Sequence, residues 1–76
     1  MEIENFVSNF AQQFEESEDI VFNSNTKFKE IDEWSSLLAL SIIAMIDEEY
    51  SVKIKGDDIR NSEAIEDLFN IVKSRL

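Results

Sequence analysis

Two adjacent serines, Ser35 and Ser36, carry the clearest chemistry in this sequence, because they stand directly before its most apolar stretch. A serine in that place commonly caps a helix, since its oxygen accepts a hydrogen bond from a free backbone N–H of the first turn. If Ser35 is the cap, Ser36 takes the first helical position, and its hydroxyl faces solvent, where another enzyme can modify it. A phosphodiester there would lie beside the positive end of the helix, which favours anions. On pattern alone, an ordinary helix start is the more common meaning of such a pair.

The rest of the composition offers little other chemistry. The chain of 76 residues contains no histidine and no cysteine. The commonest general base, thiolate metal sites and disulfides are therefore absent, and we expect a protein that is not itself an enzyme. Residues 1–76 are expected to form a single domain with a thin core, because so short a chain buries only about 60% of its unfolded surface.

The charge of the chain limits its partners. Seven basic residues against seventeen acidic ones give a formal net charge of −10. This charge would repel nucleic acid and anionic membranes and attract basic protein surfaces, although it also serves plain solubility. The acidic start, Met1–Asn5, lacks the basic-then-apolar order of a signal peptide. The longest apolar stretch, 37–46, is too short to span a bilayer. We expect a soluble, cytoplasmic and monomeric protein.

Apolar residues at helical spacing predict the elements that position the two serines. A first amphipathic helix of about four turns is predicted from Ile3 to Glu15 or Glu16. A second is predicted over 36–50, and a third main helix follows Ser62, which we expect to be its N-cap. The stripes of the first and last helices belong to the core. Their members are Ile3, Phe6, Val7, Phe10 and Phe14, then Ile65, Leu68, Phe69 and Val72.

The second helix has more apolar surface than one core-facing stripe needs. The predicted core stripe consists of Ala39, Ile42, Ile43, Ile46 and Tyr50. The other flank consists of Leu37, Leu40, Ser41, Ala44 and Glu48. Two explanations of this second flank stay open: a partner protein binds it, or the preceding loop covers it.

That loop spans residues 17–34, which show no sustained periodicity, and Asn23–Asn25 is a turn signal within it. A short sheet that pairs 21–22 with 52–54 is the less favoured alternative to a purely helical fold.

A short helical turn completes the predicted architecture. Gly56 marks a turn, after which Asp57 caps helical residues 58–61. We therefore predict an all-α fold: a small four-helix bundle with three main amphipathic helices, one short helix and a long loop between helices one and two.

This order of elements resembles that of the acyl carrier proteins over nearly the whole chain. Ser36-Leu37 aligns with the last two residues of the family's Asp-Ser-Leu motif, whose serine carries 4'-phosphopantetheine. The resemblance implies that a phosphopantetheinyl transferase attaches this arm to Ser36 from coenzyme A, and that the arm holds acyl or aminoacyl groups as thioesters. Further partners would be loading and transfer enzymes with basic docking patches, in lipid or secondary-metabolite biosynthesis. The partner-binding residues that the resemblance implies are Ser35, Leu37, Leu40, Ser41, Ala44, Asp47 and Glu48.

The sequence departs from the family at the residue before the acceptor. Ser35 stands where the family has an aspartate, so a carboxylate that could meet a basic transferase is missing. This departure favours an alternative function, in which the protein is an unmodified, carrier-like interaction or regulatory protein. Another alternative is a divalent-cation site that uses Asp57, Asp58 and the acids of 47–49, although no run has the ligand alternation of an EF-hand.

Overall fold

The predicted helices form an all-α fold, seen in a computed structural model that describes residues 2–15 and 19–76. None of these residues belongs to a β-strand, so the alternative pairing of 21–22 with 52–54 is wrong. An isolated antiparallel bridge joins Lys27 to Ala64 instead. The helical elements are α1 (Ile3–Ala11), the 3₁₀-helix η1 (Phe28–Glu30), α2 (Ser36–Tyr50), α3 (Gly56–Arg60) and α4 (Ile65–Ser74).

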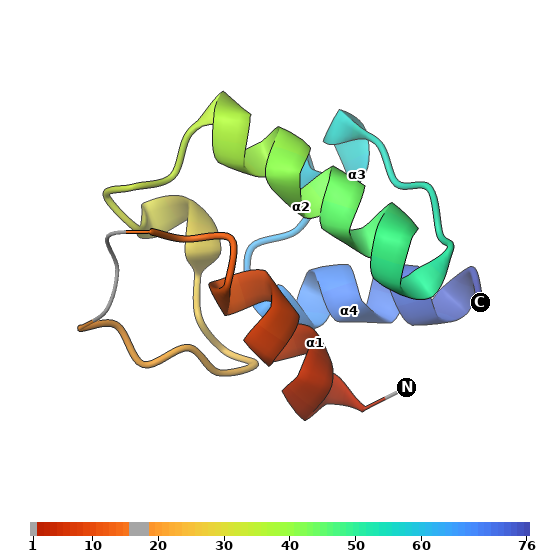
Figure 1. Ribbon diagram of the computed structural model, residues 1–76, viewed down its shortest axis with the longest axis horizontal. Coiled ribbons are helices and arrows are strands. Elements are labelled where there is room, and N and C mark those ends of the chain that lie inside the picture. The colour runs from red at the N-terminus through yellow and green to blue at the C-terminus, as the bar shows by residue number, and fades with distance from the viewer. Residues whose placement is uncertain (1, 16–18) are drawn as a thin grey trace.

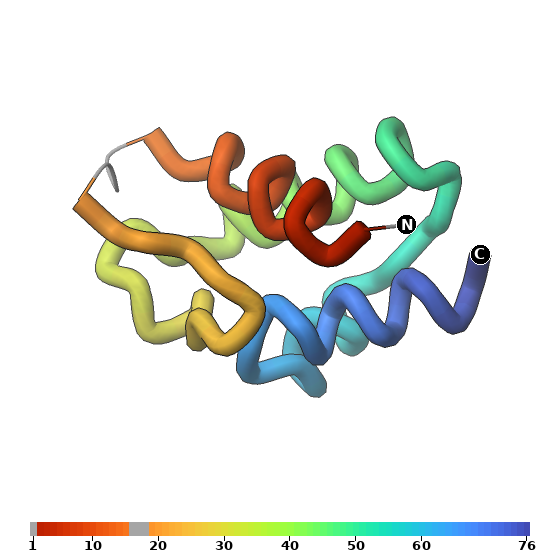
Figure 2. Tube along the Cα trace, turned by 90° about the horizontal axis from the view of Figure 1, so that it is seen from below, coloured from red at the N-terminus to blue at the C-terminus, as the bar shows by residue number. Residues whose placement is uncertain are grey.

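The helices surround one core. In Figure 1, α2 lies above α4, and the connection between α1 and α2, which contains η1, gathers at one end of the molecule. In the view from below, α1 lies above α4 (Figure 2). α1 packs against both α2 and α4, while α3 packs against α4. The fully buried large side chains are Phe6, Phe10, Phe28, Ile42, Ile46, Ile65, Leu68 and Val72.

α1 is shorter than predicted and ends at Ala11. The Gln13 N–H donates to the Phe10 carbonyl at 3.1 Å, and the Phe14 N–H donates to the Ala11 carbonyl at 3.0 Å. These bonds span three residues, so the chain tightens into a turn that carries Phe14 into the core. Phe14 therefore continues the buried aromatic stripe beyond the end of α1. The predicted end at Glu15 is wrong, and the following residue lies outside the described residues.

Every aromatic side chain of the protein belongs to one connected network of ring contacts. Phe6 of α1 meets Phe69 of α4, with ring centroids 5.5 Å apart, and Phe10 meets Phe28 of η1 at 5.1 Å. Phe28 in turn meets Trp34 at 5.0 Å. Phe6, Phe10, Phe14 and Phe69 are buried, which confirms that the aromatic residues of the predicted stripes are core. The ring contacts also fasten the long connection to the helices. The other members of the network are Phe14, Phe22 and Tyr50.

Backbone groups of the same connection hold the start of α4. The Ile65 N–H donates to the Thr26 carbonyl at 3.1 Å, and the Glu66 N–H donates to the Ser24 carbonyl at 2.9 Å. Two of the N–H groups that a helix start leaves without an intrahelical acceptor are satisfied in this way. The predicted turn is present here, since the Asn25 N–H donates to the Asn23 side-chain oxygen at 2.8 Å.

Ser62 does not cap α4, and this prediction is wrong. Ala64 is the N-cap residue. The Asp67 carboxylate, three residues further on, accepts the N–H groups of Glu63 and Ala64 at 3.0 and 2.9 Å. Ser62 is fully buried, and its hydroxyl donates to the Asp58 carbonyl at 2.9 Å. The serine therefore ends α3 rather than starting α4.

The start of α3 also differs from the prediction. The helix spans Gly56–Arg60 rather than 58–61, so the expected turn at the glycine and the expected cap at Asp57 are both wrong. Lys55 is the N-cap residue, and its N–H donates to the Asp58 carboxylate at 2.9 Å. α3 and α4 therefore begin in the same way. An acidic side chain in the first turn accepts a hydrogen bond from the N–H of the N-cap residue, whose own side chain makes no capping hydrogen bond.

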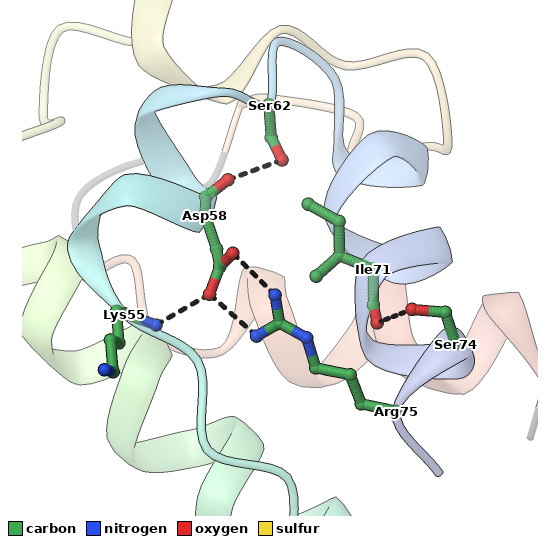
Figure 3. A network of polar contacts seen from close by, with 6 residues as sticks. All are labelled: Lys55, Asp58, Ser62, Ile71, Ser74 and Arg75. Carbon is green, nitrogen blue, oxygen red and sulfur yellow. Dashed lines mark hydrogen bonds and ion pairs between the residues drawn. The ribbon is translucent and has the colours of Figure 1, made fainter.

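Asp58 also connects α3 to α4 (Figure 3). Its two carboxylate oxygens accept hydrogen bonds from the Arg75 guanidinium at 2.8 Å each. The hydrogen bond from Arg75, followed by the one from the Lys55 N–H, lowers the pKa of Asp58 below its usual value. A single carboxylate thus fixes the start of one helix and the end of another.

Candidate functional site

The start of α2 has the geometry predicted for the two serines. Ser35 has extended backbone angles, φ −156° and ψ 171°, and its hydroxyl oxygen accepts a hydrogen bond from the Leu38 N–H at 3.3 Å. Ser35 is therefore the N-cap, as predicted. Ser36 is the first residue of α2 and is exposed. Its hydroxyl makes no hydrogen bond to another residue that the structure describes.

The face that α2 turns to the core differs in part from the prediction. Ile42 and Ile46 are buried as predicted, but Leu38 and Met45 are buried as well. The core contact is therefore displaced around the helix toward Leu38 and Met45. The other members of the predicted stripe are half-buried; they are Ala39, Ile43 and Tyr50.

The second flank of α2 is open to solvent. Leu37 is 73% exposed and Leu40 is 63% exposed, which is high for leucines. The alternative in which the loop covers this flank is therefore wrong. We call Leu37, Leu40 and Ala44 the apolar flank. Of the other predicted partner-binding residues, Ser35, Asp47 and Glu48 are exposed and Ser41 is half-buried.

A groove of about 660 Å³ runs beside Ser36, between the first half of α2 and α3. We call it the α2–α3 groove. The half-buried Ala39 and Ile43 contribute to it, which explains why they are not in the core. Its lining combines both serines, apolar side chains and two cations: Lys29, Trp34, Ser35, Ser36, Ala39, Leu40, Ile43, Gly56, Ile59 and Arg60.

Both cations of the groove lie against α3. The Lys29 ammonium donates to the carbonyl of Arg60 at 2.9 Å. The Arg60 guanidinium lies over Gly56, 3.8 Å from the position that a β-carbon would take there. Arg60 also forms an ion pair with Asp57, and both of these side chains are 74% exposed.

Sequence reasoning found the serines and the apolar flank but missed the α3 side of the groove. Lys29 and Arg60 lie far apart in the chain, and neither belongs to a periodic stripe. The one feature of the sequence that could have indicated the groove is Trp34, a large aromatic residue directly before the serine pair.

The acidic clusters do not form a metal site in the described part of the chain. Within residues 2–15 and 19–76, no three acidic side chains are grouped so that they could hold a metal ion. Asp57 forms its ion pair with Arg60, and Asp58 forms one with Arg75. The proposed cation site therefore has no geometric support there.

Comparison with protein-family models, with curated proteins and with solved structures gave no match. In the described ranges, no helix has both the length and the apolar character needed to cross a membrane.

Proposed function

We propose that this protein is a carrier that bears 4'-phosphopantetheine on Ser36 and presents acyl or aminoacyl groups to partner enzymes. The observation that carries the proposal is the exposed Ser36 hydroxyl, left free because Ser35 does the capping. Three further features support it: the α2–α3 groove beside this oxygen, the exposed apolar flank, and the net charge of −10.

The residues fit the attachment of such an arm. The Ser36 oxygen would form a bond to the β-phosphorus of coenzyme A, the pyrophosphate bond would break, and adenosine 3',5'-bisphosphate would leave. The hydroxyl proton would pass to a base of the transferase. The new phosphodiester lies at the start of α2, where free backbone N–H groups favour an anion. When attached, the arm supplies a thiol that holds the cargo as a thioester.

The apolar flank and the acids beside it would form the docking surface. Leu37 and Leu40 offer exposed apolar area next to the attachment point, and Asp47 and Glu48 extend the surface toward the end of α2. A partner with an apolar contact and a basic rim is complementary to this arrangement. The protein itself contributes recognition and a high local concentration of tethered cargo.

Intact-mass measurement tests the proposal. The protein is incubated with coenzyme A and a phosphopantetheinyl transferase of broad specificity, and we expect a gain of one arm. The Ser36→Ala variant is expected to gain nothing, while Ser8→Ala, which removes an exposed serine from α1, keeps the full gain. An unmodified wild-type protein, or a gain that survives Ser36→Ala, would contradict the proposal.

A second candidate is an unmodified interaction protein that uses the same flank. The exposed leucines favour it independently of any arm, and Ser35 removes the charge that a transferase would meet. The same mass experiment separates the two candidates, because only the carrier gains mass.

A further inference from the structure

Two cations line the α2–α3 groove of a strongly acidic protein. The chain has seven basic residues against seventeen acidic ones, yet the charged residues that line this groove are Lys29 and Arg60. The rest of its lining is apolar or hydroxyl-bearing. Covering the core does not require charged residues, and two cations would repel a basic partner. The presence of Lys29 and Arg60 in a groove that also includes Ser36 therefore needs another explanation.

Both cations can accept a ligand. Lys29 uses one of its three N–H donors on the Arg60 carbonyl, which holds the ammonium at the groove and leaves two donors. Arg60 is paired with Asp57, but both side chains are 74% exposed, and such surface pairs contribute little. An anion that enters the groove can therefore draw the guanidinium away from Asp57 at small cost.

The apolar lining defines the remainder of the ligand. Trp34, Ile43 and Ile59 present apolar surface in the same groove, and Ile59 precedes Arg60 directly in the chain. A molecule that suits this lining has a thin apolar body and one anionic oxygen group. A neutral alkyl chain would satisfy the apolar part and leave both cations unused.

We propose that the α2–α3 groove binds an organic anion of this class, with its charge between Lys29 and Arg60. This inference deepens the proposed function and rests on it, since a carrier brings such a ligand to the groove. The anionic group has two sources that share the same chemistry: the phosphate of the arm, or a terminal carboxylate on the cargo. The second source would select cargo that ends in an acid over cargo that ends in a methyl group.

Binding to the unmodified protein tests the inference separately from arm attachment. Trp34 is the only tryptophan and lines the groove, so its fluorescence reports binding there. Two pairs of probes are titrated: 4'-phosphopantetheine against pantetheine, and hexanoate against hexanol. We expect the anion to bind about tenfold more tightly than its neutral partner in at least one pair, with a preference that falls as salt is added. Preference in the first pair alone assigns the site to the arm, and preference in the second assigns it to cargo.

Substitutions test whether Lys29 and Arg60 cause the preference for the anionic probe. Lys29→Gln combined with Arg60→Gln is expected to remove it, while Lys73→Gln, which removes an exposed cation from α4, leaves it unchanged. Circular dichroism verifies that each variant is folded. Equal binding within both pairs, or a preference that survives the double substitution, overturns the inference. Because no arm is attached to Ser36 in this experiment, either result leaves the intact-mass test of the carrier proposal unaffected.

Discussion

At the scale of single residues, the two serines at the start of α2 divide two tasks. Ser35 satisfies a backbone N–H of the first turn, and Ser36 keeps its oxygen free. This division was predictable, because capping depends on residues only three positions apart. Lys29 and Arg60 were not predictable, because their meeting depends on how the long connection and α3 pack together.

The charge missing at Ser35 leads to a prediction about modification. Serine and aspartate cap helices about equally well, so Ser35→Asp is expected to leave the stability of the fold unchanged. The added carboxylate is expected to raise the initial rate of arm attachment several-fold, because it gives a basic transferase an additional charge to meet. The measurement is the initial rate of mass gain for both proteins.

Ser35→Asn is the matched control, since asparagine caps without a charge. Equal rates for the wild-type protein and Ser35→Asp would show that the transferase does not read this position.

At the scale of elements, the helices were predicted where periodicity is strong, and their ends were not. The body of α2 and the buried stripe of α4 agree with the sequence pattern. The errors at α3 and α4 have a common cause, because the most cap-like local residues, Asp57 and Ser62, are not the caps. In both cases the carboxylate three residues after the N-cap residue accepts a hydrogen bond from the N–H of that residue. These carboxylates belong to Asp58 and Asp67. Such an acid is visible in a sequence only once the helix start is known.

These two carboxylates make the stability of the fold depend on pH. Hydrogen bonds from Arg75 and then from the Lys55 N–H lower the pKa of Asp58, and those from the N–H groups of Ala64 and then Glu63 lower the pKa of Asp67. A carboxylate whose pKa is lower in the folded state stabilises that state above its unfolded pKa of about 3.9. This contribution is lost as the pH falls through the folded pKa. We therefore expect the free energy of unfolding to drop as the solution is acidified below about pH 4.

Denaturant titrations between about pH 2 and pH 6 measure this dependence. Asp58→Asn keeps an acceptor for the Lys55 N–H but removes the charge, so its stability is expected to fall less steeply on acidification. Asp32→Asn, which removes an exposed carboxylate from the connection, is the matched control. Identical slopes for the wild-type protein and Asp58→Asn would show that the bond to Arg75 does not contribute.

At the scale of the whole molecule, the α2–α3 groove, with its two cations, differs in charge from the protein as a whole, which is acidic. The chain has a net charge of −10, and such a charge favours basic surfaces, while two cations line the α2–α3 groove together with Ser36. The all-α fold was predictable from periodicity and from the absence of proline. The groove was not, because its walls come from three separate parts of the chain.

The acidic end of the docking surface leads to a prediction about association. Glu48→Lys is expected to slow binding of a basic transferase several-fold at low salt, with a smaller effect as salt screens the charges. Stopped-flow association rates at several salt concentrations measure it. Glu63→Lys makes the same change of net charge away from α2 and controls for it. Equal slowing by both variants would mean that the total charge matters and the site does not.

The network of aromatic rings has a consequence for how this chain can vary in evolution. Phe22, Phe28 and Trp34 lie at intervals along the connection, and each contacts Phe10 or Phe14. An insertion or deletion between Phe22 and Trp34 would displace at least one of these rings from its contact, so the length of this part of the connection is constrained. Residues 23–25 form a turn between Phe22 and Phe28. The carbonyls of Ser24 and Thr26 accept hydrogen bonds from backbone N–H groups at the start of α4. A segment that shows no periodicity in the sequence is therefore tied to α4 through its backbone.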